Sequence, residues 1–332
     1  MSAPVQVGKV LFVCDSDRLA VPAIHLLRSA DFDVTHVRGA LDARTWLRIH
    51  RADVAIVDWA VPEPERSAAI DLVERLRAGA GLAASHVLVL AHVQGREQIA
   101  RLFGETQLAN FFALGADGTI DPVELSVTVA KILSRDIFGV ARYVAPNAET
   151  KEFRVRRSGD KDGIVDFAEK FAREAGCHSQ LAQHVAVSVD ELVTNAVYNA
   201  PADRDGRPRY GHVPRNVPVE LEPHEEVAVT LARDDRRVCV AARDAFGSLA
   251  PERVIEYLAR CFSAGEDQIA TRSGGAGLGL YELFHMVNSF VLNIAPGRST
   301  ECIGLFEISR SYRAYATKAK SFNIFVEGRA AR

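Results

Sequence analysis

The sequence predicts two globular domains, an α/β domain with a parallel sheet at residues 1–135 and an α+β domain at residues 151–332, joined by a connector at 136–150. The chain has 332 residues, which is enough for two hydrophobic cores. The first part alternates short β-branched runs with amphipathic stretches, and this pattern favours a doubly wound parallel sheet. In the second part, helices and strands follow one another in mixed order, which favours a sandwich with helices on one face of a mixed sheet.

Hydrophobic periodicity predicts the individual elements of the first domain. Short runs rich in Val, Leu and Ile predict buried strands, and apolar residues spaced three and four apart predict amphipathic helices. Pro122 after Asp121 suits the first position of a helix, which marks the start of the closing helix. The expected strands lie at 9–15, 52–58 and 86–91, and the expected helices lie at 21–30, 68–78 and 122–133.

The same patterns predict the elements of the second domain. A polar loop rich in Pro, Gly and Arg at 201–218 separates its first helices from the strands that follow. The expected strands lie at 151–156, 227–233, 237–244, 290–296, 300–309 and 321–326, and the expected helices at 163–176, 190–200, 251–262 and 278–288.

Composition excludes several classes of function. The net charge of -3 provides no basic excess to neutralise phosphates, so we expect no nucleic-acid ligand. No apolar run has the length of a membrane span and the N-terminus lacks a signal-peptide core, so we expect a cytoplasmic protein without membrane contact. The cysteines show no CxxC or Cys/His spacing, so neither disulfides nor structural zinc are expected at Cys14, Cys177, Cys239, Cys261 and Cys302.

The stretch DELVTNAVYNA carries polar side chains along an otherwise apolar helix. Glu191, Asn195 and Asn199 are each four residues apart, so they form one stripe on a helix surface. Asn is a poor helix former, and a merely solvated face would more often carry Lys, Arg and Glu. The stripe is therefore either a buried hydrogen-bond network or a site for a hard cation such as Mg²⁺, which prefers carboxylate and amide oxygens.

Two further motifs follow the stripe along the chain. In ARDAFGSL, Asp244 ends a buried strand and a turn containing Gly247 follows it. In SGGAGLGLYE, a glycine-rich turn enters a helix, where backbone N–H groups can approach an anion closely. Two other phosphate-binding patterns fail: GxGxxG would need a glycine at Leu280 or Glu282, and no GxxxxGK[ST] sequence occurs.

The order and spacing of these three motifs over about residues 150–310 resemble the Bergerat-fold ATPases, the group that contains gyrase B, Hsp90, histidine kinases and MutL. The sequence DELVTNAV most resembles the anti-sigma-factor serine kinases of bacterial partner switching. The resemblance implies a Bergerat-fold sandwich that binds ATP with Mg²⁺. It also implies a mobile lid between Ser248 and Ser273.

The resemblance also implies a role for each motif residue. Asp244 would accept a hydrogen bond from the adenine amino group, with Gly247 in the turn beside it. Asn195 would hold Mg²⁺, Asn199 would support the phosphates or the metal, and Glu191 would be the general base. The phosphates would lie against the segment formed by Gly274, Gly275, Ala276, Gly277, Leu278 and Gly279. This chain departs from the usual D-x-G-x-G pattern because Phe246 stands at the first glycine position.

The first domain resembles a response-regulator receiver domain, a flavodoxin-like fold, with VDWAVPE at the end of the phosphoacceptor strand. By this resemblance, Asp58 is the phosphoacceptor and Asp15 lies beside it. The usual first acid is replaced by Cys14, the usual hydroxyl by Ala91, and no Lys follows NFFAL. An aspartyl nucleophile needs Mg²⁺ and partners for the phosphoryl oxygens. We therefore expect a degenerate receiver that docks partners or dimerises, with Asp17 as a substitute metal ligand if phosphorylation occurs.

Together the motifs predict an ATP-binding bacterial signalling protein, either an anti-sigma-type serine/threonine kinase or a related regulator acting on a sigma-antagonist-like or other protein partner. The degenerate receiver would supply regulatory input or a homodimer contact. One alternative is a non-enzymatic switch or scaffold in which ATP closes the lid. The other is an atypical histidine-kinase-like component, although residues 136–177 contain no His and are too short for a dimerising hairpin.

Overall fold

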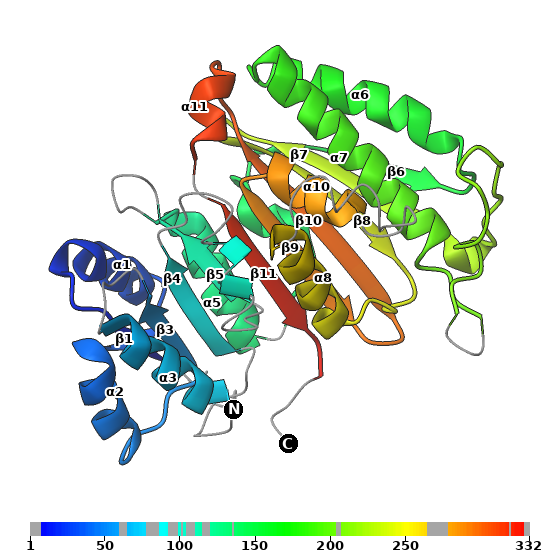
Figure 1. Cartoon of the computed structure of the whole chain (residues 1–332). Helices are drawn as coiled ribbons and strands as arrows, with labels where there is room; N and C mark the ends of the chain where they lie inside the picture. The colour runs from blue at the N-terminus through cyan, green and yellow to red at the C-terminus, as the bar shows by residue number, and fades with distance from the viewer. Residues whose placement is uncertain are drawn as a thin grey trace, which may run out of the picture. The chain divides into compact units, whose positions relative to one another are not determined.

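The structure, a computed structural model, describes residues 8–59, 65–77, 86–91, 99–100, 102–103, 110–114, 120–134, 136–203, 207–263, 278–318 and 320–328. The chain divides into two compact units (Figure 1). Unit 1 comprises Met1–Ile137 with Gly328–Arg332, and unit 2 comprises Phe138–Glu327.

Unit 1 contains a parallel sheet in the order β2-β1-β3-β4-β5. This is the flavodoxin-like doubly wound order, which CheY also has. The central strands β3 and β4 are buried along their whole length, as expected for strands covered on both faces. The strands are β1 (Lys9–Val13), β2 (Asp33–Val37), β3 (Val54–Asp58), β4 (Val87–Ala91) and β5 (Asn110–Ala113).

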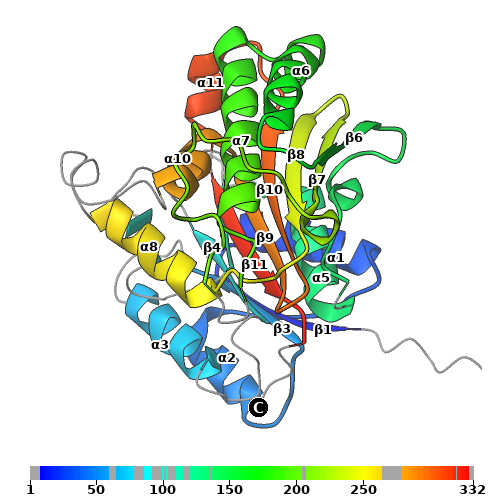
Figure 2. The same cartoon turned by 90° about the vertical axis from the view of Figure 1, so that its right-hand side faces the viewer.

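Helices cover both faces of the unit 1 sheet. Figure 2 shows α1 and α5 on one side of the strands and α2 and α3 on the other, and the helices of each pair contact each other. The predicted start of α5 is confirmed, because the Asp121 carboxylate accepts a hydrogen bond from the Glu124 N–H at 2.9 Å. The described helices of unit 1 are α1 (Asp17–Ser29), α2 (Gly39–Leu47), α3 (Glu65–Arg77) and α5 (Pro122–Ser134).

Unit 2 contains a mixed sheet in the order β11-β9-β10-β8-β7-β6. Its strands pair antiparallel except β9 and β11, which are parallel. The strands are β6 (Glu149–Val155), β7 (Val227–Arg233), β8 (Arg237–Asp244), β9 (Ser289–Ala295), β10 (Ser299–Glu307) and β11 (Ser321–Val326). The predicted α+β class with a mixed sheet is therefore correct.

Helices α6 and α7 lie side by side over one face of this sheet (Figures 1 and 2). Phe153 of β6 meets Phe167 of α6 edge to face, and the apolar side of α7 is buried over β8. Each fully buried Leu or Val on such a face contributes about 1.5–3 kcal/mol. The described helices of unit 2 are η2 (Val140–Tyr143), α6 (Asp160–Glu174), α7 (Ser179–Tyr198), η3 (Pro223–Glu225), α8 (Pro251–Ser263), α10 (Leu278–Met286) and α11 (Tyr312–Ala316).

The segment expected as a connector contains regular structure. Its 3₁₀ helix η2 packs against β7 and β8, and β6 already begins at Glu149. The Gly139 N–H donates to the Glu301 carboxylate of β10 at 2.8 Å, which ties the start of unit 2 to its own sheet. The expected span of 136–150 is therefore partly built into unit 2.

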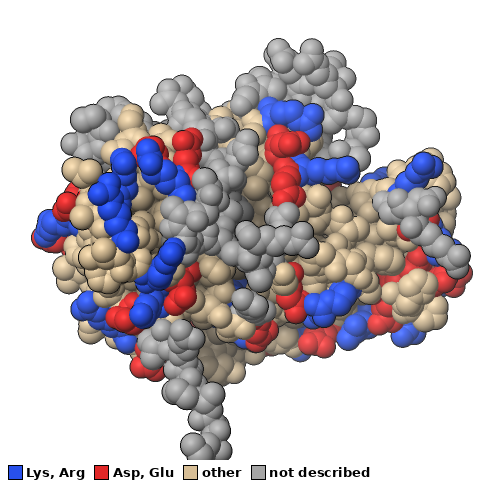
Figure 3. All heavy atoms as spheres, turned by 90° about the horizontal axis from the view of Figure 1, so that it is seen from below, with Lys and Arg blue, Asp and Glu red and all other residues tan. Residues whose placement is uncertain are grey.

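Charged side chains of both signs lie among one another on the face drawn in Figure 3. This distribution fits the small net charge of -3. Within the described part of the chain, no helix combines the length and hydropathy needed to span a membrane.

Candidate functional site

The polar stripe lies on the C-terminal half of α7. Helix α7 buries one face, and Glu191 and Asn195 are partly exposed beside it. The helix ends at Tyr198, so Asn199 is its C-cap residue and not a further helical position. The Asn199 side-chain N–H₂ donates to the Asn195 amide oxygen at 2.9 Å. The predicted stripe therefore exists, and its two amides are joined to each other.

Helix α10 begins against this stripe. A Cβ built at Gly279 would stand 2.0 Å from Glu191 Oε2 and 3.7 Å from Asn195 Nδ2. Any larger residue at this position would have to displace the end of the Glu191 side chain, so glycine lets the first turn of α10 approach the carboxylate as it stands. The structure thus brings the end of the glycine-rich segment to the two leading residues of the stripe.

Asp244 lies at the end of β8 and is buried, with 8% of its surface exposed. Its Oδ1 atom accepts hydrogen bonds from three backbone N–H groups, those of Phe246 at 2.8 Å, Gly247 at 3.2 Å and Thr300 at 3.3 Å. Burial raises the pKa of this carboxyl, and the backbone hydrogen bonds act in the opposite direction. All three backbone bonds go to one oxygen, so the turn fixes the orientation of the carboxylate.

The turn after Asp244 contacts the end of the stripe. Ser248 Oγ donates to the carbonyl of Ala200 at 3.2 Å, immediately after Asn199. Phe246 stands where the D-x-G-x-G pattern has its first glycine, and its N–H donates to the Asp244 carboxylate. The centroid of its ring lies 6.4 Å from that of His224. Segments far apart in the sequence therefore meet around the C-terminal half of α7.

Part of the predicted site lies outside the described residues. This applies to Gly274, Gly275, Ala276, Gly277 and the lid from residue 264 to Ser273. The described part of the predicted lid contains α8, and α10 begins at Leu278.

The Glu191 carboxyl has a raised pKa. Burial is the largest cause, and the neighbouring carboxylates of Asp190 and Glu282 add to it, while Lys161 and Arg215 act in the opposite direction. Lys161 Nζ itself donates to Asp190 Oδ1 at 2.5 Å and to Thr194 Oγ1 at 3.2 Å. A carboxylate with a raised pKa holds a proton more readily than an ordinary Glu, which suits a group that accepts a proton.

Replacing Glu191 with Gln should change the pH dependence of stability. A raised pKa means that the folded state binds this proton more tightly than the unfolded chain. The stability that comes from the carboxyl is therefore complete below its ordinary pKa of 4.5 and is lost as the pH rises through the folded-state pKa. The free energy of unfolding of Glu191→Gln relative to the parent should increase above about pH 4.5. Denaturant titrations at acidic and neutral pH measure it, and a pH-independent difference would contradict the argument.

Two cations that no sequence pattern indicates lie beside the stripe. Arg215 comes from the polar loop and its Nη2 donates to Asn199 Oδ1 at 3.4 Å, while Lys161 comes from α6. The loop contains several Arg residues, and neither spacing nor periodicity distinguishes the one that reaches α7. Only the fold identifies Arg215.

In unit 1, Asp58 lies at the end of β3 and is buried. The Cys14 thiol donates to Asp58 Oδ2 at 3.1 Å, and burial together with this carboxylate raises the pKa of the thiol to about 12. Both line a hollow of about 190 Å³ with Asp15, Leu41 and Ala68. The sequence placed Asp15 beside Asp58, and the structure brings both to this hollow.

The substitute ligand expected in unit 1 has another partner. Asp17 forms an exposed ion pair with Arg38, whose guanidinium also donates to the Asp15 carbonyl. Ala91 at the end of β4 is buried and offers no hydroxyl. A thiol thus replaces the acid next to Asp58, and a methyl group replaces the hydroxyl.

Acetyl phosphate and beryllofluoride should therefore change unit 1 little. Cys14→Asp restores a second carboxylate beside Asp58 and should increase Mg²⁺ affinity by roughly tenfold or more. Mass spectrometry after treatment with acetyl phosphate, and Mg²⁺ titration of both proteins, measure these outcomes. A stable, stoichiometric aspartyl phosphate on Asp58 in the parent protein would contradict the expectation.

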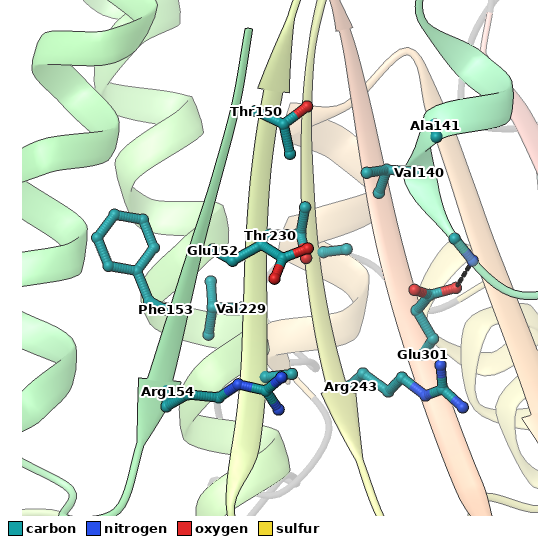
Figure 4. A pocket seen from close by; sticks show the side chains of 13 residues that line it. Val140, Ala141, Thr150, Glu152, Phe153, Arg154, Val229, Thr230, Arg243 and Glu301 are labelled. Carbon is teal, nitrogen blue, oxygen red and sulfur yellow. Dashed lines mark hydrogen bonds between the residues drawn. The ribbon is translucent and has the colours of Figure 1, made fainter.

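A second groove, of about 390 Å³, lies on the face of the unit 2 sheet opposite α6 and α7 (Figure 4). The small residue Ala228 of β7 lines this groove. It lies in register between the longer side chains Arg154 of β6 and Arg243 of β8, which line the groove on either side of it. Ser299 Oγ accepts from Arg243 Nε at 2.9 Å and donates to the Asp244 carbonyl at 2.7 Å. This serine therefore links the groove to the turn that holds the Asp244 carboxylate.

Within the described ranges, no three His, Cys, Asp or Glu side chains lie close enough together to hold a metal ion. The oxygens of Asn195 and Glu191 remain a donor set of the kind that Mg²⁺ accepts when phosphates supply the other ligands. Gly279 approaches the Glu191 carboxylate oxygen and the Asn195 amide nitrogen, while the Asn195 oxygen accepts from Asn199.

Comparison of sequences gives no match with a protein-family model or a curated protein. Solved structures match unit 1. The signal receiver domain of a signal transduction histidine kinase from Syntrophus aciditrophicus is 24% identical over 39% of this chain and 92% of that one, with a TM-score of 0.33. The chemotaxis response regulator CheY4 of Vibrio cholerae is 20% identical over 38% and 99%, with a TM-score of 0.32.

A further similar structure is the signal receiver domain of a modulated diguanylate cyclase from Desulfovibrio desulfuricans G20, 20% identical over 39% of this chain and 96% of that one, with a TM-score of 0.32. These TM-scores are below 0.5, so the strand order, and not the similarity, defines the fold of unit 1. The chain combines a flavodoxin-like unit of receiver topology with an α+β unit that carries a polar helix stripe.

Proposed function

We propose that unit 2 binds ATP with Mg²⁺ and that the protein is a signal-transduction regulator. In its most specific form, it is an anti-sigma-type serine/threonine kinase that acts on a regulatory protein. The main support is the meeting of three segments around α7. Glu191 and Asn195 lie against Gly279, and the turn of Asp244 reaches Ala200 through Ser248. These are the segments through which the chain resembles the Bergerat-fold ATPases.

Each side chain has a physically defined task in this proposal. The second oxygen of Asp244 would accept from the adenine amino group, while its Oδ1 atom stays on the backbone. Asn195 would hold Mg²⁺, which neutralises charge on the phosphates, and Asn199 would orient the Asn195 amide through their hydrogen bond. Glu191, with its raised pKa, would take the proton of the attacking hydroxyl or water.

The receiver topology of unit 1 supports the signalling part of the proposal. With a thiol beside Asp58 and no hydroxyl at Ala91, unit 1 would regulate by docking a protein or a second copy of the chain rather than by phosphorylation. The protein partner would carry the phosphoryl acceptor.

The test separates binding from transfer. Calorimetry with a non-hydrolysable ATP analogue should show binding that Mg²⁺ strengthens, and Asn195→Ala should lose most of the part that depends on Mg²⁺. Glu191→Gln should bind the analogue like the parent but lose phosphate release or transfer to Ser by about a hundredfold or more. Gln183→Ala, an exposed amide earlier on α7, is the matched control.

Each outcome has a distinct meaning. No binding of the analogue by the parent protein would rule out the proposed function. Binding without phosphate release or transfer in the parent would favour the alternative, a switch in which ATP only changes the conformation of the lid.

A further inference from the structure

Tyr198 fixes one segment of the polar loop against the end of α7. Its ring is buried, with 1% exposed, and its hydroxyl lies 3.3 Å from the Arg215 carbonyl and 3.1 Å from the Val217 carbonyl. A buried tyrosine whose hydroxyl reaches two backbone carbonyls holds the chain there by both packing and hydrogen bonding. The main chain of Arg215 is therefore fixed next to the stripe.

The Arg215 side chain is held in place as well. Its guanidinium carbon lies 4.3 Å from the centre of the Tyr198 ring, and Nη2 lies 3.4 Å from the amide oxygen of Asn199. In the part of the chain that the structure describes, no carboxylate forms an ion pair with it. Arg209 of the same loop, in contrast, pairs with Glu222 at 2.6 Å and Glu225 at 2.9 Å. Arg215 is thus positioned and exposed, and none of the described carboxylates forms an ion pair with it.

The contacts of Arg215 lead directly into the stripe. Asn199 joins it to Asn195, and Asn195 lies next to Glu191 and Gly279. A positive charge in this place favours an anion at the stripe, since the direct side-chain contacts of Arg215 there are the uncharged Tyr198 ring and the neutral Asn199 amide. The electrostatic effect of Arg215 reaches Glu191, where it lowers the pKa of the carboxyl. A guanidinium is also suited to phosphate because its planar N–H groups can bind two oxygens at once.

We propose that Arg215 binds the phosphate chain of the nucleotide and makes the site selective for phosphorylated over unphosphorylated adenine ligands. This inference rests on the proposed function of unit 2. The residue that binds the negative charge of the phosphates then lies outside the stripe and outside the glycine-rich turn. Asp244 recognises the adenine base, and Arg215 recognises the phosphates.

The experiment compares ATP and adenosine on the full chain. Ligand-detected NMR titration measures weak affinities, and each variant is first shown to melt like the parent. Arg215→Met should weaken ATP binding by about ten- to a hundredfold and leave adenosine binding unchanged. Arg215→Lys keeps the charge but not the planar guanidinium, so its ATP affinity should lie between those of the parent and of Arg215→Met. Arg207→Met removes the same charge from an exposed position in the same loop and should behave like the parent.

The outcomes distinguish this inference from the proposed function. If Arg215→Met weakens ATP and adenosine equally, the residue only supports the loop, and the inference is wrong. If it weakens neither, or if Arg207→Met has the same effect, the inference is also wrong. If the parent binds neither ATP nor adenosine, the proposed function fails and the inference falls with it.

Discussion

Gly247→Ala should destabilise unit 2 by roughly 3 kcal/mol or more. Gly247 has a φ of +61°, and a Cβ at this position would stand 2.0 Å from the Ala295 carbonyl oxygen. Two costs to the folded state add up here. The left-handed backbone conformation disfavours Ala, and the added Cβ clashes with a main-chain atom that cannot rotate away. The displaced backbone would also weaken the hydrogen bond from the Gly247 N–H to Asp244.

Gly297→Ala is the matched control for this prediction. Gly297 has a φ of +70° in the turn between β9 and β10, but a Cβ at this position would meet no described atom within 4 Å. Gly297→Ala should therefore lower the free energy of unfolding only by the cost of the left-handed backbone conformation, about 1 kcal/mol. Thermal unfolding of the two variants measures the difference, at about 2–4 °C per kcal/mol for a unit of this size. Equal melting temperatures would contradict the steric argument.

Asp244→Asn should weaken ATP binding by about ten- to a hundredfold, the equivalent of roughly 1.5–3 kcal/mol for a hydrogen bond to a charged group. The Asn oxygen can still accept the backbone N–H groups of Phe246, Gly247 and Thr300, so the turn should keep its shape. The Asn amino group would replace the second carboxylate oxygen and present a donor to the adenine amino group, which is itself a donor.

Asp234→Asn is the control for the adenine prediction. Asp234 lies just before β8, at the opposite end of that strand, and its carboxylate likewise accepts from backbone N–H groups, those of Ala145, Arg236 and Arg237. It should leave ATP affinity unchanged. If Asp244→Asn binds ATP as tightly as the parent protein, Asp244 is only a turn residue and the adenine role is wrong.

The sequence predicted the strands better than the helix ends. The ranges 227–233, 237–244 and 321–326 coincide with β7, β8 and β11, because alternating or continuous apolar runs are bounded there by turn residues. The strands β2 and β5 and the helices α2 and α11 were not predicted. Helix α2 and strand β2 bury few of their residues, so their hydrophobic pattern is weak.

The fold gives Asp17 a partner that its sequence position does not show. The sequence offered Asp17, two residues after Asp15, as a substitute metal ligand, and in the structure its carboxylate forms an exposed ion pair with Arg38, which follows β2. This contact depends on the parallel pairing of β1 with β2, which places the residues that follow both strands at the same edge of the sheet. A linear pattern cannot show which charged side chains share that edge.

By itself, the sequence determined what is local. The spacing of Glu191 and Asn195 places them on one side of a helix, and the three-residue step from Asp244 to Gly247 makes a carboxylate-capped turn. These features follow from helix geometry and short-range hydrogen bonding, which depend on neighbouring residues alone.

Only the tertiary structure decided which distant segments complete the site. It placed Gly279 against Glu191 and brought Arg215 onto Tyr198 and Asn199. Those contacts depend on how α10 packs on α7 and on the path of the polar loop across the end of that helix. Packing of this kind is set by the shape and burial of many side chains together, and no spacing within the linear sequence encodes it.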